Sequence, residues 1–383
     1  MNKRKKSSKA AIVTWCYDNG KTNYGQILQC YAMQTIMQRL GYNTKVIRYR
    51  KREHDEAVSW ERKPQAVINL YELAYRLIRV EKKLDVRILR FVTFIGRNIF
   101  LSRQCYTKEQ VEKECGDCEV LVCGSDQIWN PAWFQDVYAL NFGKDSQKRI
   151  AYAPSGVMIE NERNKKVYRQ LGKYIDRFDL VTVREKKSIA ILEKYTKKKI
   201  RDVWDPTLLL TQEDWNRVSA GSVTGKPYIF CYSLGRLRAH KVLLKYIMKK
   251  YEADRVLYIV SGYYENESDL ERGGYFYPVK NAGPAQFLAL IRDANAVCTD
   301  SFHGLALSVI YRRQFFVLDR RDLQANVNAN FVRQENLLER AGIGRQRFVK
   351  CVRDVEEAGE IDYGKVQAGN CWEEVKALFG EVL

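Results

Sequence analysis

Residues 296–310 have the sequence AVCTDSFHGLALSVI, in which a polar turn separates two apolar segments. Ala296–Thr299 is a short apolar run of the kind found in buried parallel strands. Apolar residues then recur through about residues 304–312, which predicts a helix. The polar residues between the two segments would lie at the carboxyl end of the strand. A strand followed directly by a helix is half of a parallel βαβ unit.

The same alternation runs along most of the chain. In its first half, strands are predicted at Ala11–Trp15, Thr44–Tyr49, Glu119–Cys123, Arg149–Ala153 and Leu180–Val183, with helices at Tyr24–Leu40 and about residues 184–195. In its second half, strands are predicted at Tyr228–Ser233, Arg255–Ser261, Ala296–Thr299 and Gln314–Leu318, with helices at about 240–251, 284–293 and 304–312. We therefore expect an α/β protein with two Rossmann-like domains that face each other across a cleft.

A polar stretch at residues 219–227, SAGSVTGKP, is typical of a linker and suggests the domain boundary. We predict an N-terminal domain at 1–218, a C-terminal domain at 219–346, and a segment at 347–383 whose helix packs back on the N-terminal domain.

A helical insertion is expected at about 62–103, where apolar and basic residues recur at helical spacing. This spacing favours a pair of helices that buries its apolar stripe against the domain. A basic surface that contacts anionic lipid or a lipid-linked acceptor is the alternative.

The composition is that of a folded and strongly basic protein, with 46% hydrophobic residues, 29% charged residues and a formal net charge of +19. Such a charge favours an anionic partner, such as nucleic acid, an anionic membrane surface or a phosphorylated substrate. No nucleic-acid-binding pattern supports the first, so no nucleic-acid partner is expected. No apolar run approaches the roughly 20 residues that span a bilayer. We expect a cytoplasmic location, with peripheral contact at the inner face of the membrane as an option.

The ten cysteines are scattered through apolar surroundings, as in a reducing compartment. Cys115 and Cys118 form an isolated C-x-x-C, without the second ligand pair of a zinc site or a thioredoxin-like context. We interpret the pair as incidental. The chain has no H-E-x-x-H, Walker loop or G-x-S-x-G motif. No metal and no cofactor are therefore expected.

Polar clusters follow several predicted strands, at the edge where parallel sheets bind their ligands. A turn with Gly25 opens the first predicted helix, and the backbone N–H groups of such a turn can hold an anion. Capping and packing roles explain the same residues equally simply. The candidate binding residues are Asn23, Gly25, Gln26, Ser125, Gln127, Ser155, Arg184, Ser233, Arg236, Lys280 and Ser301, and the candidate catalytic residues are Asp126 and His303.

His303 is one of three histidines in the chain. His54 lies in a charged loop and His240 follows a basic stretch, whereas His303 lies at the edge of a predicted site. A histidine there can act as a general acid or base, because its pKa lies near neutral pH. A helix-capping or structural role is about equally open.

Taken in order, six segments resemble the polysaccharide pyruvyl transferase family. They are NYGQILQ (23–29), GSDQIWNP (124–131), VRE (183–185), DPT (205–207), GPAQF (283–287) and TDSFHG (299–304). The resemblance covers about residues 11–320. It implies a two-domain fold like that of the GT-B glycosyltransferases, with phosphoenolpyruvate as donor. The acceptor would be a sugar diol of a bacterial surface polysaccharide, such as a capsule or exopolysaccharide, or its lipid-linked precursor, and the product a pyruvate ketal.

Carried over residue by residue, the resemblance makes His303 the general acid or base and Arg184 a ligand of the donor's phosphate or carboxylate. Some members have Arg-Leu-His where this chain has Ser301-Phe302-His303. Either another cation replaces that arginine, or the donor differs. The candidates for the cation are Arg236, Arg238 and Lys280.

Two other functions stay open at this point. A glycosyltransferase that uses a nucleotide sugar would share the fold, and fold does not decide function. A protein without catalytic activity that binds glycan or an anionic surface would explain the basic helical insertion.

Overall fold

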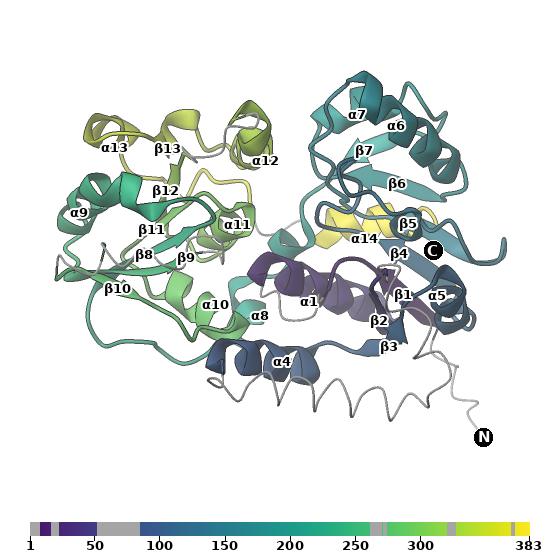
Figure 1. The fold of residues 1–383 in the computed structure, drawn as a ribbon, viewed down its shortest axis with the longest axis horizontal. Coiled ribbons are helices and arrows are strands. Elements are labelled where there is room, and N and C mark those ends of the chain that lie inside the picture. Colours follow the sequence, from purple (N-terminus) through teal and green to yellow (C-terminus); the bar gives the residue numbers. More distant parts are fainter. Residues whose placement is uncertain are drawn as a thin grey trace.

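The computed structural model describes residues 8–16, 23–51, 85–260, 270, 274–319, 327–368 and 372–383, which form two α/β domains (Figure 1). Most of the predicted helical insertion, residues 62–84, lies outside the described residues, as do residues 19–22 of the first glycine-containing turn.

The first sheet has the strand order β3-β2-β1-β4-β5-β6-β7, and every neighbouring pair is parallel. The order reverses between β1 and β4, and ligands of open parallel sheets bind beyond the carboxyl ends of the strands at such a point. Its strands are β1 (Lys9–Val13), β2 (Asn43–Tyr49), β3 (Leu101–Cys105), β4 (Val120–Cys123), β5 (Lys148–Ala151), β6 (Leu180–Val183) and β7 (Ile200–Asp202).

The second sheet repeats this topology in the order β10-β9-β8-β11-β12-β13, again with parallel neighbours. Its reversal lies between β8 and β11. Its strands are β8 (Tyr228–Ser233), β9 (Arg255–Val260), β10 (Phe276–Pro278), β11 (Ala296–Thr299), β12 (Gln314–Leu318) and β13 (Phe348–Val349).

Helices connect the strands and cover the sheets (Figure 1). Those of the first half of the chain are α1 (Tyr24–Arg39), α4 (Val86–Asn98), α5 (Lys108–Cys115), α6 (Glu162–Ile175), α7 (Lys187–Leu192) and α8 (Gln212–Asn216). Those of the second half are α9 (Lys241–Lys250), α10 (Pro284–Arg292), α11 (Phe302–Ile310), α12 (Val327–Arg340), α13 (Val352–Ala358) and α14 (Trp372–Gly380). The 3₁₀ turns are η2 (Asp136–Ala139), η3 (Pro206–Leu209), η4 (Leu237–His240) and η6 (Arg345–Arg347).

Both faces of each sheet are buried, which explains why the strands are apolar throughout instead of alternating. In β1, Ala10 and Ile12 belong to one hydrophobic cluster and Ala11 and Val13 to another. The first of these clusters continues into the second domain, for example through Val297 of β11. A third cluster covers the opposite face of the second sheet. One apolar core is therefore shared by the two domains.

The start of α1 joins the domains. The Tyr24 ring stacks on Phe287 of α10, with centroids 4.3 Å apart, and meets Tyr232 of β8 edge-on at 5.6 Å. Its hydroxyl donates a hydrogen bond to the carbonyl of Ala282, 2.8 Å away. Because Tyr24 is the first residue of α1, this contact fixes the position of that helix's N-terminus against the second domain.

The chain returns to the first domain at its C-terminus, where α14 lies beside β5 (Figure 1). Phe379 of α14 stacks on Tyr152, with centroids 5.6 Å apart. Arg201 of β7 donates two hydrogen bonds to Glu381, each of 2.8 Å.

The structure differs from the sequence-based expectations mainly at short edge elements. Leu101–Arg103, placed in the helical insertion, belong to β3, and β7, β10 and β13 were not expected as strands. The helix expected at 184–195 shortens to α7. The helix expected from residue 304 begins at Phe302, because Ser301 caps its N-terminus. His303 therefore lies in the first turn of α11 and not in the loop before it.

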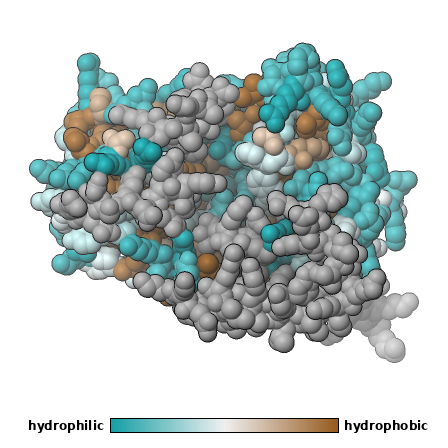
Figure 2. Space-filling view, viewed as in Figure 1, coloured by the Kyte–Doolittle hydropathy of each residue, from teal (hydrophilic) through white to brown (hydrophobic). Residues whose placement is uncertain are grey.

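On the face shown in Figure 2, hydrophilic residues cover most of the coloured surface, and hydrophobic residues form separate patches. No helix within the described ranges is long and apolar enough to cross a bilayer.

Candidate active site

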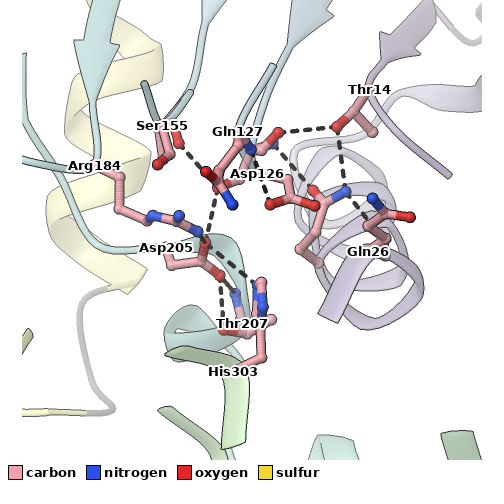
Figure 3. A network of polar contacts seen from close by, with 12 residues as sticks. Thr14, Gln26, Asp126, Gln127, Ser155, Arg184, Asp205, Thr207 and His303 are labelled. Carbon is pink, nitrogen blue, oxygen red and sulfur yellow. Dashed lines mark hydrogen bonds and ion pairs between the residues drawn. The ribbon is translucent and has the colours of Figure 1, made fainter. Parts of the chain in front are cut away.

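The candidate site lies where the carboxyl ends of the two sheets meet. Loops that follow β4, β5, β6 and β7 contribute side chains from the first domain, and the start of α11 contributes side chains from the second (Figure 3). A buried network of hydrogen bonds and ion pairs joins these segments, which are far apart in sequence.

Asp205 is the centre of this network. It is 1% exposed and caps η3, accepting hydrogen bonds from the backbone N–H and the hydroxyl of Thr207 at 3.0 and 2.7 Å. Its other oxygen, Oδ2, accepts from Ser125 Oγ and from Arg184 Nη1, both at 2.8 Å. Four hydrogen bonds therefore hold one buried carboxylate in a single orientation.

Arg184 pairs with two carboxylates. Besides Asp205, its Nε donates to Glu185 Oε1 at 3.0 Å, and Ser155 Oγ donates to the same oxygen at 2.7 Å. The guanidinium also lies over the ring of Phe302 from α11, 4.1 Å from its centroid. The arginine is thus held by acidic groups of the first domain and an aromatic ring of the second.

Three buried polar atoms of this network have no hydrogen-bond partner among the described residues: Arg184 Nη2, Glu185 Oε2 and His303 Nε2. Unpaired buried groups are costly and rare, so each calls for an explanation. All three belong to the network of the candidate site, where a ligand or ordered water would satisfy them.

His303 reaches the network from the second domain. Its Nε2 lies 3.9 Å from Asp205 Oδ2, and its ring packs on Gly25 of α1. A Cβ at position 25 would lie 2.1 Å from His303 Nδ1, so only glycine leaves room for the ring. The hydroxyl of Ser301 accepts from the N–H of Gly304 at 3.4 Å and fixes the first turn of α11.

The ionisation of these groups follows from burial and from their neighbours. Burial by itself raises the pKa of Asp205, but His303 and Arg184 outweigh it and lower that pKa to about 2. Burial lowers the pKa of His303 below its ordinary value, while Asp205 and Asp126 act in the opposite direction. The lowered pKa favours the neutral imidazole, and Arg184 is then the cation beside Asp205. Burial also opposes the charge of Arg184, yet its carboxylate neighbours raise its pKa.

Asp126 lies in the loop after β4, beside the network. Its φ of +65° places it in the left-handed region, which is uncommon for a residue with a side chain. The backbone N–H of Gln127 donates to its Oδ1 at 2.8 Å, and its carbonyl accepts from the N–H of Ser155 at 2.8 Å. Its carboxylate helps to raise the pKa of Arg184 and opposes the lowering of the pKa of His303 by burial, so it acts on the same site.

The candidates named from the sequence fall into two groups. Gly25, Ser125, Asp126, Ser155, Arg184, Ser301 and His303 meet in or around the network. Of the others, Asn23 caps α1 and is exposed, and Gln26 and Gln127 lie near the network and are half-buried (Figure 3). Ser233 is buried in its own turn with Gly235, and Arg236 and Lys280 are exposed on the second domain.

Asp205, Glu185 and Phe302 are central to the site but were not named as candidates. Each lies inside a segment that carried the family resemblance, so the segments were found and the roles of these residues were not. An aspartate directly before proline is a sign of a helix N-cap. That sign predicts the cap of η3 but does not reveal that the second oxygen faces an arginine and a histidine.

Cys115 and Cys118 are both buried free thiols, and burial raises the pKa of each. Within the part of the chain that the structure describes, no group of three or more histidine, cysteine, aspartate or glutamate side chains is placed to hold a metal ion.

Comparisons with known proteins agree with this architecture. The chain resembles the UDP-N-acetylglucosamine 2-epimerase of Methanocaldococcus jannaschii, with a TM-score of 0.56, 11% identity, and coverage of 97% of this chain and 99% of that one. It also resembles a Listeria monocytogenes protein assigned as a UDP-N-acetylglucosamine 2-epimerase, with a TM-score of 0.50, 8% identity, and coverage of 98% and 90%. At these identities the likeness shows the fold alone, which is the GT-B-like arrangement expected from the sequence.

A search of curated protein sequences found no match to this chain. A model of one protein family, described as polysaccharide pyruvyl transferase, matches residues 23–322. The matched range contains all six segments of the resemblance and every residue of the network described above. On this evidence, the chain belongs to the polysaccharide pyruvyl transferase family and is a transferase.

Proposed function

We propose that the chain transfers the pyruvyl group of phosphoenolpyruvate to two hydroxyls of a saccharide, in a surface polysaccharide or its lipid-linked precursor. The observation that carries the proposal is the placement of His303, from one domain, against the buried Asp205 and Arg184 of the other. A proton carrier and a set of fixed charges meet there at the carboxyl ends of both sheets.

The reaction requires one proton donor and one proton acceptor. Protonation of the methylene carbon of phosphoenolpyruvate makes its central carbon electrophilic, and a first sugar hydroxyl adds there and loses its proton. The second hydroxyl then displaces phosphate from the same carbon and loses its proton, which closes the ketal. We assign the proton donor to His303. Asp126 is the candidate acceptor of one hydroxyl proton, and the other hydroxyl proton leaves with the released phosphate.

The lowered pKa of His303 is consistent with a general acid that becomes protonated when the donor binds. Burial keeps the pKa of its imidazole below the ordinary value in the structure described here. A donor with several negative charges would favour the imidazolium form, because an opposite charge nearby raises the pKa of a histidine. The acid would therefore be charged when the donor is in place.

Arg184 by itself is a poor match for the whole charge of the donor. Its Nε and Nη1 already bind Glu185 and Asp205, which leaves Nη2 for a ligand. Further cations must come from elsewhere, and the candidates are Arg236, Arg238 and Lys280, all exposed on the second domain.

The test is a titration with phosphoenolpyruvate by calorimetry, combined with an assay of phosphate release in the presence of a panel of methyl glycosides with free diols. Wild-type protein should bind phosphoenolpyruvate saturably and release phosphate only when a suitable diol is present. His303→Gln should lower turnover by about 100-fold or more, since general acid catalysis contributes that much. His240→Gln is the matched control, because His240 is also buried but binds the carbonyl of Asp319.

UDP-N-acetylglucosamine serves as the competing ligand in the same titration. Binding of that nucleotide sugar without binding of phosphoenolpyruvate would replace the proposal with nucleotide-sugar transfer. A fully active His303→Gln variant would remove His303 from the mechanism.

A further inference from the structure

His303 and Asp205 form a contact that neither domain contains alone. His303 is the second residue of α11 in the second domain, whereas Asp205 follows β7 in the first. Their facing atoms, Nε2 and Oδ2, are 3.9 Å apart and both side chains are buried (Figure 3). A small rotation of the imidazole would bring this pair to hydrogen-bond distance.

Both oxygens of Asp205 are held by hydrogen bonds, whereas Nε2 of His303 has none among the described residues. Thr207, Ser125 and Arg184 hold both oxygens of Asp205, as described above. No hydrogen bond to His303 Nε2 is present among the described residues, although that atom is buried. A rigid carboxylate that faces an unsatisfied ring nitrogen is suited to hold a proton on that nitrogen, as carboxylates do for histidines in many active sites.

The opposite ring nitrogen faces a different surface. Nδ1 lies over Gly25, in the space that a Cβ would fill. A Cβ there would lie 2.1 Å from Nδ1, so this side of the ring is packed against the backbone of α1.

Charged groups reach His303 from four elements. Asp205, the N-cap of η3, and Asp126 after β4 favour the protonated ring, whereas Arg184 after β6 and Arg333 on α12 disfavour it. Gly25 on α1 carries no charge. Asp205 Oδ2 lies 3.9 Å from Nε2 of the ring, so removal of this carboxylate should change the proton affinity of the histidine more than removal of the other charged groups.

We propose that Asp205 is the positioning residue that keeps a proton on His303 Nε2, and that this pair exists only while the two domains are together. Separation of the domains abolishes the pair. The catalytic meaning of the pair rests on the proposed function, but its existence can be tested without any substrate.

The experiment is a pH titration of the full-length protein by nuclear magnetic resonance, with ¹⁵N-labelled histidine. The chain has three histidines, so the variants His54→Gln and His240→Gln assign the signals by elimination. In the wild type we expect the neutral His303 ring to carry its proton on Nε2. Asp205→Asn should lower the titration midpoint of His303 by about 1–3 pH units, the usual effect of losing an opposite charge at this distance.

The matched control is Asp319→Asn. Asp319 Oδ1 lies 3.7 Å from Nε2 of His240, so this variant should shift the midpoint of His240 and leave that of His303 unchanged. An unchanged His303 midpoint in folded Asp205→Asn would overturn the proposal. If that variant does not fold, the wild-type tautomer decides, because a neutral ring protonated on Nδ1 contradicts the proposal on its own.

The outcomes also separate this inference from the proposed function. Phosphoenolpyruvate that neither binds nor reacts would remove the reaction and leave the His303–Asp205 pair intact if the tautomer and the shift are as expected. Conversely, if the enzyme is active but the titration midpoint of His303 does not depend on Asp205, the proposed reaction stands and the proposed His303–Asp205 pair is wrong.

Discussion

At the residue scale, the absence of a side chain at Gly25 determines where the ring of His303 can lie. The ring of His303 occupies the volume in which any other residue at position 25 would place its Cβ. Asp205 and Arg184 depend on each other in a similar way, since each is buried and each supplies part of the other's charge balance. Removal of one partner of such a buried pair leaves the other charge uncompensated, which is strongly destabilising.

We predict that Gly25→Ala displaces His303 and destabilises the protein by about 1–3 kcal/mol, the usual cost of overpacking. Phosphate release from phosphoenolpyruvate should fall together with stability, and urea denaturation measures the latter. Gly96→Ala is the matched control, because a Cβ at this position in α4 would meet no atom of the described residues within 4 Å. That change should keep full activity and stabilise the helix slightly. Equal behaviour of the two variants would show that the ring position does not depend on Gly25.

At the scale of the element, α11 delivers His303. Its position depends on Ser301, which caps the helix, and on the end of β11, where Thr299 Oγ1 accepts from the N–H of Ser301 at 3.0 Å. Asp300 between them accepts from the N–H groups of Leu234 and Gly235 at 2.7 and 3.0 Å, which ties the turn after β8 to the start of α11. The two strands at the reversal of the second sheet therefore fix the start of α11 together.

We expect Ser301→Ala to lower the free energy of unfolding by about 0.5–2 kcal/mol, the usual cost of losing a helix cap. Turnover should fall further than stability alone explains, since the first turn of α11 carries His303. Asn161→Ala removes the cap of α6, where Asn161 Oδ1 accepts from the N–H of Asn164 at 2.9 Å. This control should lose comparable stability and keep its activity. Urea denaturation and the phosphate-release assay measure the two quantities, and an unaffected turnover in Ser301→Ala would contradict the expectation.

At the scale of the whole molecule, the site is complete only because two domains share one core. The apolar cluster that contains Tyr24, Phe287 and Val297 runs from one sheet to the other. Hydrogen bonds also join the two domains. Asn336 of α12 donates to the carbonyl of Arg184 at 3.1 Å and accepts from the N–H of Lys186 at 3.2 Å. The domain interface and the candidate site are thus parts of the same contact surface.

We predict that Tyr24→Phe, which removes the hydrogen bond to Ala282, costs about 1 kcal/mol in the free energy of unfolding. Turnover should fall as well, because this bond lies next to Gly25 and holds α1 against the second domain. Tyr228→Phe is the matched control, since its hydroxyl donates to the carbonyl of Leu290 at 3.0 Å inside one domain. It should lose similar stability and retain turnover. Identical turnover in both variants would mean that this interdomain bond does not affect the site.

The sequence by itself determined the fold class and most of the segments that form the site. Apolar strands such as Leu180–Val183 and Tyr228–Ser233 were predicted with the bounds they have, because both faces of each sheet are covered and the apolar runs are unbroken. Edge strands such as β7 and β13 were missed, since two or three residues paired on one side leave little pattern. The order of the six resemblance segments along the chain also indicated the family.

Only the tertiary structure decided which side chains meet. Asp205 and His303 are almost a hundred positions apart and in different domains, and no local pattern predicts that their facing atoms lie 3.9 Å apart. The structure also showed that Arg184 is already paired with two carboxylates, which the sequence could not reveal. Local propensity and hydrophobic pattern depend on neighbours in the chain, whereas charge balance and the space above Gly25 depend on neighbours in three dimensions.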